Sequence, residues 1–383
     1  MQSRLTAEAY QSEDWFARER TLLFKPLWQF VGLRSMLAQH NAFITRSVWG
    51  VPVVVQNFHG ELQAFENLCL HRQNPLQTAP QGVRPLVCSY HGWGYGADGA
   101  VQHIPFEADV YRYPAAERAC LRLRRYALQV VGGLVFINLS EAPLPLTDQF
   151  SPELLESLRG VSMAFDGEVL QATFQTRMNW KLAYENLRDS HHPRYVHAQS
   201  LYQKVKFTVS LDEAGVTLSQ RLRQQGVQGR DEALPLMRGF SSGGPDAPME
   251  SLPPYAWHAK VERYGQLDWY YNWLVFPNLH IASGSGGYSF IIEHHVPVSA
   301  GRTDVVVHYV TAKKKAKYAV SAAVLLAHLQ GAETVLREDF AVMERIQAGL
   351  HAQAPTAVLG DFESANQTIE HWYLDLMGGR FAL

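Results

Sequence analysis

Cysteine is scarce in this sequence, and long apolar runs are absent. The 383 residues include only Cys69, Cys88 and Cys120, too few for the disulfide framework of a small secreted domain. No run of eighteen apolar residues occurs, so we expect no transmembrane helix and no membrane partner. Residues 1–19 are polar and charged and lack the apolar core of a signal peptide. We therefore expect a cytoplasmic protein.

Net charge is also nearly absent. The chain has 34 Lys and Arg residues against 36 Asp and Glu residues, a formal net charge of −2. That balance gives no reason to expect binding to nucleic acid or to an anionic membrane surface. We recognise no dinucleotide-binding fingerprint, and three cysteines are too few for a four-cysteine cluster of the ferredoxin type. We therefore do not expect this chain to take electrons from NAD(P)H directly.

The apolar content, in contrast, is sufficient for two hydrophobic cores. Hydrophobic residues make up 47% of the chain and charged residues 18%, and 383 residues are too many for one ordinary core. We predict three segments: a helical N-terminal segment at 1–27 that packs on the second domain, an all-β domain at 28–142, and a domain of mixed type at 143–383.

The two predicted domains differ in their local patterns. In the first domain, short apolar runs separated by Gly and Asn turns predict strands, with a hairpin turn at 57–60. In the second, apolar strands joined by Gly-rich turns predict an antiparallel sheet with helices beside it. The predicted elements are strands at 43–49, 51–57, 128–131, 134–138, 269–282, 288–298 and 302–312, helices at 180–192 and 317–350, and a long loop at 224–254.

Two of the three cysteines stand beside histidines. Cys69-Leu70-His71 and Cys88-Ser89-Tyr90-His91 each offer one thiolate and one imidazole. Such a set can hold a [2Fe–2S] cluster in which one iron takes both cysteines and the other takes both histidines. Neutral imidazoles in place of thiolates raise the reduction potential of the cluster. Zinc is the alternative metal for two cysteines and two histidines, although zinc spacings usually pair Cys with Cys and His with His. Cys120 is left over, and we expect it to be a buried thiol.

A second group of metal-binding residue types lies farther along the chain. Asp189 and His192 are three residues apart and would share one face of a helix. On an unbroken helix His197 would be turned by about 140° from His192. Pro193 disfavours helix at His192, so we predict a break or bulge there that re-aims His197 toward His192. His191 is an alternative to His192 as a ligand.

Two imidazoles need a carboxylate to complete a facial triad for iron(II). We predict that Asp339 supplies it, because Asp339 falls within an apolar helix stripe, and a buried carboxylate is costly unless a cation compensates it. Glu333, Glu338 and Glu344 lie off the stripe, where exposure explains them. The alternative for Asp339 is an ion pair with a buried Arg or Lys. The stripe consists of Val335, Leu336, Val342, Met343, Ile346 and Leu350.

Together these motifs resemble those of the Rieske non-haem iron oxygenases, in particular the large or α subunits of ring-hydroxylating oxygenases. The family's C-x-H-R and C-x-Y-H-G-W motifs appear at 69–72 and 88–93. Its N-W-K…E-N-x-x-D-x-x-H-x4-H motif appears at 179–197, and its E-D-x4-E-x-x-Q segment at 338–347. The resemblance implies an α+β protein, with an all-β Rieske domain beside a helix-grip (START-like) catalytic domain that has a central antiparallel sheet.

The resemblance also implies roles for single residues. Asp189 would bridge a cluster histidine and His192 across a subunit interface, and Asn186 is a candidate for a hydrogen bond close to the iron. Ser89 stands where proline is usual in the family, and His191 stands where tyrosine is frequent. The implied ligands are Cys69, His71, Cys88 and His91 for the [2Fe–2S] cluster, and His192, His197 and Asp339 for the mononuclear Fe(II).

A multi-component enzyme with O2 as co-substrate follows from the resemblance. Electrons would come from a separate ferredoxin or reductase, so NAD(P)H would act only indirectly, and transfer would run between neighbouring subunits in a ring of three. We predict a homotrimer, and the presence of an additional small β subunit stays open. We predict hydroxylation of a small organic substrate, with an aromatic compound as the leading candidate. Whether one or two oxygen atoms are inserted also stays open.

Three other functions fit parts of the sequence. Oxidative N- or O-demethylases share the family's motifs. A Rieske electron carrier would need no second metal site, and a zinc-stabilised ligand-binding module would need no redox cluster. Colour separates the zinc protein from the others, because a Rieske cluster makes the purified protein red-brown and zinc leaves it colourless.

Overall fold

The computed structural model describes most of the chain in two compact units. The smaller unit is Phe30–Pro143, and the larger unit is Met1–Gln29 together with Leu144–Leu383. The boundaries expected from the sequence, after residues 27 and 142, lie within two residues of these. Asp189 and His191 are outside the described residues. The described residues are 2–188, 192–202, 242–248, 255–265, 269–283, 286–317, 320–350, 353–360 and 364–378.

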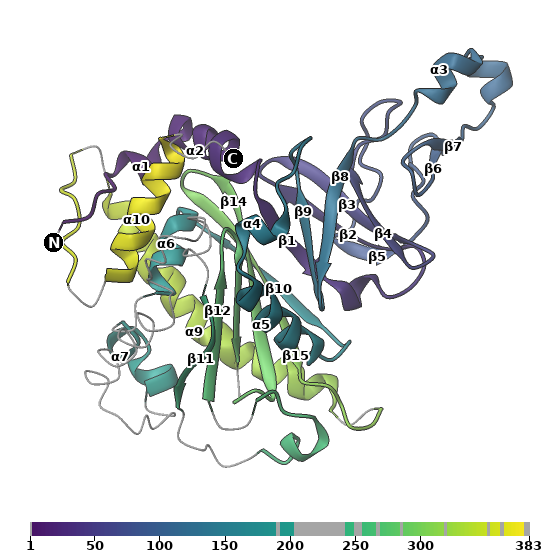
Figure 1. Cartoon of the computed structure of the whole chain (residues 1–383). Coiled ribbons are helices and arrows are strands. Elements are labelled where there is room, and N and C mark those ends of the chain that lie inside the picture. Colours follow the sequence, from purple (N-terminus) through teal and green to yellow (C-terminus); the bar gives the residue numbers. More distant parts are fainter. Residues whose placement is uncertain are drawn as a thin grey trace. The chain divides into compact units, whose positions relative to one another are not determined.

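The smaller unit is built on a sheet of short strands (Figure 1). Seven strands follow the order β1-β9-β8-β4-β3-β2-β5, and a separate hairpin pairs β6 with β7. The four strands predicted in this region are present as β2, β3, β8 and β9. The bounds are β1 Trp28–Leu33, β2 Ala42–Val48, β3 Val51–Phe58, β4 Glu61–Glu66, β5 Gln81–Val83, β6 Gly94–Tyr95, β7 Val101–His103, β8 Arg125–Val131 and β9 Leu134–Asn138.

The hairpin turn predicted at 57–60 joins β3 to β4, which pair antiparallel. His59 has φ 55° and Gly60 has φ 101°, and two successive positive φ values are what a two-residue type I′ turn requires. The side chain of Asn57 closes the turn, because its Oδ1 accepts the Gly60 N–H at 2.6 Å. The Asn and Gly of this turn therefore fix the register of the hairpin.

The letters G-x-G-x-x-G occur at Gly94–Gly99. In the structure this stretch forms β6 and the turn that leads to β7. It therefore lacks the strand–turn–helix setting of a dinucleotide-binding site, in which a helix N-terminus faces the pyrophosphate.

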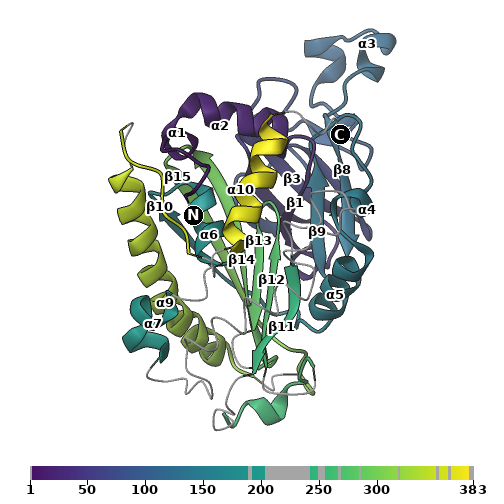
Figure 2. The same ribbon diagram turned by 60° about the vertical axis from the view of Figure 1, so that its left-hand side comes forward.

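The larger unit is a six-stranded antiparallel sheet with the long helix α9 (Ala322–Gly349) against one face (Figures 1 and 2). Phe174 of β10 packs on Phe340 of α9, with ring centroids 5.6 Å apart. Tyr309 of β15 stacks on His328 at 5.6 Å, so α9 follows the outer strands of the sheet. The sheet order is β10-β15-β14-β13-β12-β11. The bounds are β10 Leu170–Thr176, β11 Ser242–Pro248, β12 Trp269–Val275, β13 Leu279–Ser283, β14 Ser289–Ser299 and β15 Arg302–Thr311.

Four predicted elements of the larger unit need correction. The helix predicted at 180–192 ends at Asn186. The strand predicted at 269–282 is two strands, β12 and β13, which turn at Phe276–Asn278 and pair with each other; Pro277 lies in that turn because proline cannot donate to a central ladder. Part of the loop predicted at 224–254 is strand β11, and its other residues lie outside the described chain. The helix predicted from residue 317 begins only at Ala322.

The N-terminal helices belong to the larger unit. Glu19, at the end of α2, is fully buried. Its carboxylate accepts from Lys181 Nζ at 2.6 Å and from Trp180 Nε1 at 3.0 Å, which attaches the N-terminal helices to α6. None of the helices in the described segments is long and apolar enough to cross a membrane. The other helices are α1 Glu8–Gln11, α2 Glu13–Glu19, η1 Arg20–Phe24, η2 Arg34–Leu37, η3 Glu107–Tyr111, α3 Ala115–Ala119, α4 Leu146–Gln149, α5 Pro152–Met163, α6 Trp180–Asn186, α7 Pro193–Val196, η4 Ala198–Tyr202, η6 His258–Lys260 and α10 Ser364–Met377.

Candidate metal sites

Two loops of the smaller unit carry the two Cys/His pairs. One loop follows β4 and holds Cys69, and the other lies between β5 and β6 and holds Cys88. Both sulfur atoms are buried in the core of the unit. Gly92 has φ 73°, and a Cβ there would lie 2.9 Å from Pro105 Cγ. Glycine at this position therefore allows both the left-handed backbone and the close approach of Pro105.

The side chains of these loops form a thiol pair and an imidazole pair. Cys69 and Cys88 interact with each other, and the rings of His71 and His91 lie 4.5 Å apart between centroids. Nδ1 of His71 is buried and has no hydrogen-bond partner in the described part of the chain. A buried nitrogen left this way is costly unless something else binds it. Two sulfurs together and two imidazoles together fit a [2Fe–2S] cluster, in which each pair would take one iron.

A single zinc ion fits this arrangement less well. Zinc needs its four ligand atoms around one centre at about 2.0–2.3 Å, which brings the ligand atoms close to one another. Among the described residues, the group whose possible ligand atoms all lie within 4.8 Å of one another is a different one, His192, His197 and Asp339. The Cys/His residues of the two loops do not form such a compact group, which favours the two-iron interpretation.

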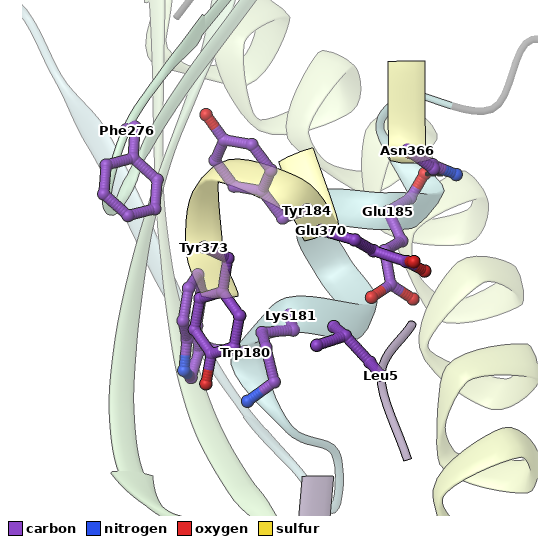
Figure 3. Close-up of a pocket in the computed structure, with 9 residues that line it drawn as sticks. All are labelled: Leu5, Trp180, Lys181, Tyr184, Glu185, Phe276, Asn366, Glu370 and Tyr373. Atoms are coloured by element: carbon purple, nitrogen blue, oxygen red, sulfur yellow. Dashed lines mark hydrogen bonds between the residues drawn. The ribbon is translucent and has the colours of Figure 1, made fainter. Parts of the chain in front are cut away.

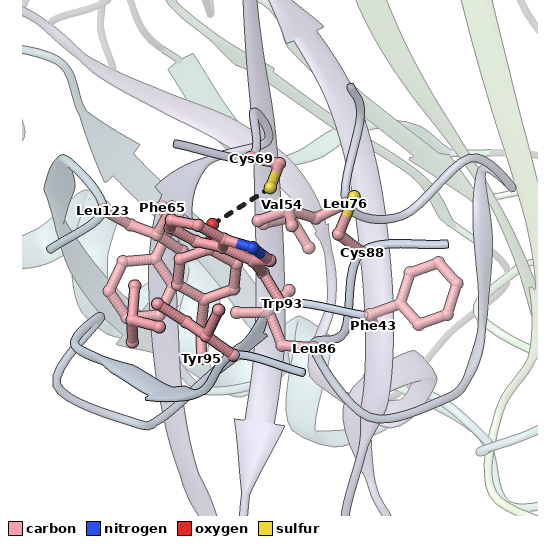
Figure 4. Packing of buried hydrophobic residues seen from close by; sticks show 12 residues of the cluster. Phe43, Val54, Phe65, Cys69, Leu76, Leu86, Cys88, Trp93, Tyr95 and Leu123 are labelled. Atoms are coloured by element: carbon pink, nitrogen blue, oxygen red, sulfur yellow. Dashed lines mark hydrogen bonds between the residues drawn. The ribbon is translucent and has the colours of Figure 1, made fainter. Parts of the chain in front are cut away.

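Tyr95 supplies a hydrogen bond to one of the thiols (Figure 4). Tyr95 Oη lies 3.1 Å from Cys69 Sγ, and it accepts the Leu70 N–H at 3.0 Å. When Cys69 is a thiolate, the Tyr95 hydroxyl is the donor of this bond, because a thiolate has no hydrogen to donate. Asn74 Nδ2 lies 3.6 Å from Cys88 Sγ. Neither residue was predicted from the sequence, although Tyr95 stands only four positions after His91.

The two thiols differ in their acidity. Burial raises the pKa of Cys69. Burial acts in the same direction on Cys88, but the backbone N–H groups of Tyr90 and His91 outweigh it and lower the pKa of that thiol. Donors aimed at the sulfur stabilise a thiolate, which is the form that binds metals.

Cys120 is exposed, so the prediction of a buried thiol was wrong. It follows directly after α3, a five-residue helix with no buried residue. A helix this short that buries nothing leaves its C-terminal residue in solvent.

The second predicted site begins at α6. Asn179 caps this helix by accepting the Lys181 N–H at 3.0 Å, and the helix ends at Asn186. The predicted break at His192 is present, because α6 ends at Asn186 and a new helix, α7, begins at Pro193. His192 has helical φ and ψ and precedes Pro193, which begins the new helix α7. Proline is compatible with the first position of a helix. A second irregularity, which the sequence did not predict, lies at His197, where α7 ends and the π-helical turn η4 follows.

The two predicted histidine ligands and Asn186 all lie close to one carboxylate oxygen of Asp339, the third predicted ligand. Asp339 Oδ1 lies 3.4 Å from His192 Nε2 and 3.1 Å from His197 Nε2. Asn186 Nδ2 donates to the same oxygen at 3.3 Å. The two imidazole rings are 5.3 Å apart between centroids. Two imidazoles and one carboxylate, with possible ligand atoms that all lie within 4.8 Å of one another, match the donor set of a facial triad.

The surroundings of Asp339 differ from the prediction in two respects. Its side chain is 13% exposed, so it is not fully enclosed by aliphatic groups, and Ile346 of the predicted stripe is 46% exposed. Leu336 and Met343 of the stripe are buried as expected. Its ion-pair partners among the described residues are the two histidines, so the alternative of a buried Arg or Lys partner finds no support there.

Glu338 is a member of this site that the sequence analysis placed on the exposed face. Its Oε2 lies 2.8 Å from His197 Nδ1 and also accepts from Ser200 Oγ. Burial alone would lower the pKa of His197, but the hydrogen bonds and charges of Asp339 and Glu338 outweigh it and raise that pKa. A helical wheel separates Glu338 from the apolar stripe, and nothing in the wheel shows that α7 and η4 lie beside that position.

Family models match both parts of the chain. The model described as "Rieske [2Fe-2S] domain" matches residues 27–114, and the model described as "Ring hydroxylating alpha subunit (catalytic domain)" matches residues 166–379. The second match covers more than half of the chain, so the chain belongs to the ring-hydroxylating oxygenase α-subunit family. The resemblance inferred from the motifs is confirmed, and so is the fold class of a Rieske domain with an α+β catalytic domain.

Curated relatives match at moderate identity. The large oxygenase component of the naphthalene 1,2-dioxygenase system of Pseudomonas aeruginosa is 30% identical over 200 residues, 49% of this chain and 43% of the relative. The oxygenase subunit of glycine betaine monooxygenase from Chromohalobacter salexigens is 29% identical over 204 residues, 52% of this chain and 44% of the relative. The matched segments thus span less than half of the length of these relatives.

The fold is also shared with a solved structure over nearly its whole length. The crystal structure of the quaternary ammonium Rieske monooxygenase CntA in complex with an inhibitor superposes with a TM-score of 0.72 at 20% identity, and covers 97% of this chain and 94% of that one. At this identity the similarity establishes the fold.

Proposed function

We propose that this chain is the terminal oxygenase component of a Rieske oxygenase system, which uses O2 and electrons from a separate reductase or ferredoxin to oxidise a small organic substrate. The observation that carries the proposal is the meeting of His192, His197 and Asn186 at the Asp339 carboxylate. An electron carrier has no use for such a triad. When bound there, ferrous iron would supply open coordination positions for dioxygen.

The protein's own residues have distinct tasks in this proposal. Cys69, Cys88, His71 and His91 would hold the cluster. Trp93 stacks on His71 with ring centroids 5.2 Å apart and an interplanar angle of 5°, which holds the imidazole in orientation. Asn186 holds one Asp339 oxygen by donating to it, so the carboxylate keeps its direction toward both histidines.

The electron partner and the assembly are part of the proposal. The chain has the ligands for one cluster, which carries one electron at a time. With three cysteines it has too few for a second cluster. A ferredoxin or reductase would therefore deliver electrons singly, and NAD(P)H would act through it. We further propose a homotrimer in which Asp189 of one subunit joins the cluster histidine of a neighbour to His192. Asp189 lies outside the described residues, and this role comes from the motif.

For the substrate we propose a small aromatic compound that is hydroxylated, in line with the naphthalene dioxygenase component among the relatives. The second candidate is oxidative N- or O-demethylation. The glycine betaine monooxygenase subunit, at nearly the same identity, favours this candidate as strongly. Screening aromatic and N-methyl substrate libraries under labelled O2 separates the two. Ring hydroxylation leaves the labelled oxygen on the aromatic product, whereas demethylation releases the methyl group as a one-carbon fragment.

Metal analysis tests the proposed site. Anaerobically reconstituted protein should contain about three irons per chain, two in the cluster and one in the triad. Asp339→Ala should lose the third iron and keep the red-brown cluster absorbance. Wild-type protein with only two irons, or an Asp339→Ala variant with unchanged iron, would contradict the proposal.

The bridge role of Asp189 has its own test. Asp189→Ala should keep both metal centres and the cluster absorbance but lose product formation, because the connection between centres is broken. The control is Asp166→Ala, which removes a carboxylate that lies outside the 179–197 motif and pairs with Lys314. Full turnover by the Asp189 variant would refute the role.

A further inference from the structure

Two neighbouring carboxylates of α9 face the two ring nitrogens of one histidine. Asp339 Oδ1 lies 3.1 Å from His197 Nε2, and Glu338 Oε2 lies 2.8 Å from His197 Nδ1. His197 itself is only 3% exposed. The ring is therefore held from both sides by one turn of a helix.

This arrangement specifies which nitrogen of His197 carries hydrogen. An ionised carboxylate only accepts hydrogen bonds, so at the short Glu338 contact the Nδ1 atom is the donor. Nε2 also faces a carboxylate, that of Asp339 at 3.1 Å, so the assignment holds for the ring with a metal bound there: the hydrogen stays on Nδ1 and the lone pair is on Nε2. Nε2 is the atom that points to the oxygen shared by Asp339 and His192, and it is therefore the atom available to a metal.

Glu338 is in turn held in place. Ser200 Oγ donates to the same Oε2 atom that faces His197, and the Glu338 side chain is 28% exposed. Ser200 lies in η4 (Ala198–Tyr202), the π-helical turn that begins directly after His197. Such turns are rare and occur frequently at functional sites. Here the wider turn brings Ser200 back to the carboxylate that His197 contacts.

We propose that Glu338 is a positioning residue, which fixes His197 as the Nδ1–H tautomer and presents its Nε2 to the iron of the Asp339 triad. The inference rests on the proposed iron site and adds to it a residue that the family motifs do not identify as a ligand. A carboxylate behind a ligating imidazole orients the ring and increases its basicity, and the loss of such a partner typically weakens metal binding by about 10- to 100-fold.

Iron(II) affinity tests the proposal without any substrate. Wild type, Glu338→Gln and Glu338→Ala are compared by anaerobic competition against a chromophoric chelator. Glu338→Ala should bind iron about 10- to 100-fold more weakly. Glu338→Gln should lie between the two, because its amide oxygen still accepts from Nδ1–H but carries no charge. Ser200→Ala leaves the carboxylate in place and should lower affinity less than Glu338→Ala.

Glu333→Gln is the matched control. Glu333 lies on the same helix and pairs with Arg337 at the surface, so this variant should bind iron like wild type. Cluster absorbance and melting temperature should be unchanged in all variants that fold, which separates positioning from a structural role. Wild-type affinity in both Glu338 variants would overturn the inference.

Failure of the inference is distinguishable from failure of the proposed function. If the Glu338 variants keep full affinity while Asp339→Ala loses the third iron, the triad stands and Glu338 has no positioning role. If wild-type protein takes up no third iron at all, the proposed site and the inference both fall. Should Glu338→Ala fail to fold, Glu338→Gln and Ser200→Ala carry the test.

Discussion

A single tyrosine connects the cluster site to its protein surroundings. Tyr95 is buried, and its hydroxyl makes two contacts: it accepts the Leu70 N–H and lies against the Cys69 sulfur. Hydrogen bonds to cluster sulfurs stabilise the reduced, more negative state and so raise the reduction potential. The potential of this chain's cluster should therefore depend on one hydroxyl group.

Tyr95→Phe should lower the midpoint potential of the cluster. If the bond favours the reduced state by about 1 kcal/mol, as a typical hydrogen bond does, the shift for a one-electron couple is about 40 mV. Redox titration followed by the visible absorbance measures it. Tyr113→Phe is the control, because Tyr113 packs beside Trp93 through its ring. An unchanged potential in Tyr95→Phe would mean that the hydroxyl does not donate to the sulfur.

At the scale of elements, α6 depends on the residue before it. Asn179 is 1% exposed. Its Oδ1 caps α6 through Lys181 N, and its Nδ2 donates to Ala300 O at 2.7 Å and Tyr10 O at 3.2 Å. One side chain thus joins α6 to the turn between β14 and β15 and to α1. Because α6 ends at Asn186, this junction also supports one side of the Asp339 site.

Asn179→Ala should destabilise the protein by about 2–3 kcal/mol, since it removes a helix cap and takes away the donor to the Ala300 carbonyl. The Tyr10 carbonyl keeps its hydrogen bond from Gln347 Nε2. The matched control is Ser151→Ala at α5, where the side chain accepts only the Leu154 N–H at 3.1 Å. That loss should cost about 1 kcal/mol. Denaturant unfolding monitored by circular dichroism measures both. Equal effects in the two variants would show that the contacts to Ala300 and Tyr10 contribute nothing.

The elements that the sequence predicted are those with a local signal. The short valine-rich run at 51–57 and the Asn57 turn specify a hairpin from neighbouring residues alone. Asp339 could be selected because a helical wheel is also a local pattern. Glu338 and Tyr95 were missed because their partners lie 141 and 26 residues away. No periodicity reports which element packs beside an off-stripe residue, and only the three-dimensional arrangement of α7, η4 and α9 supplies that information.

At the scale of the whole molecule, a half-buried acidic group makes the stability of the larger unit depend on pH. Glu185 of α6 accepts from Tyr10 Oη at 2.6 Å, and burial is the main cause that raises its pKa to about 7. Figure 3 shows its carboxylate beside that of Glu370 from α10, in the wall of a cavity of about 10 Å³. The N-terminal segment, α6 and α10 therefore meet around one titrating group.

Stability should fall as pH rises from about 4.5 to about 7. The folded pKa of Glu185 is above its ordinary value of 4.5, so the folded state binds the proton more tightly, and this advantage disappears as the pH passes the folded pKa. The full shift corresponds to at most about 3 kcal/mol. Glu185→Gln should flatten the melting temperature between pH 5 and pH 8, while Glu61→Gln, at an exposed strand position, should follow the wild-type curve. If the melting temperature of the Glu185 variant changed with pH as that of wild type does, Glu185 would not be the group that causes the pH dependence.

The exposed position of Cys120 has a practical consequence. Of the three thiols, the other two are buried at the proposed cluster site, and Cys120 stands at the end of α3 without any role in either metal site. A maleimide dye or a nitroxide spin label would attach there first. Such a probe gives spectroscopists a reporter on the smaller unit, whose signal can test docking of the proposed electron donor while the proposed iron ligands stay unmodified.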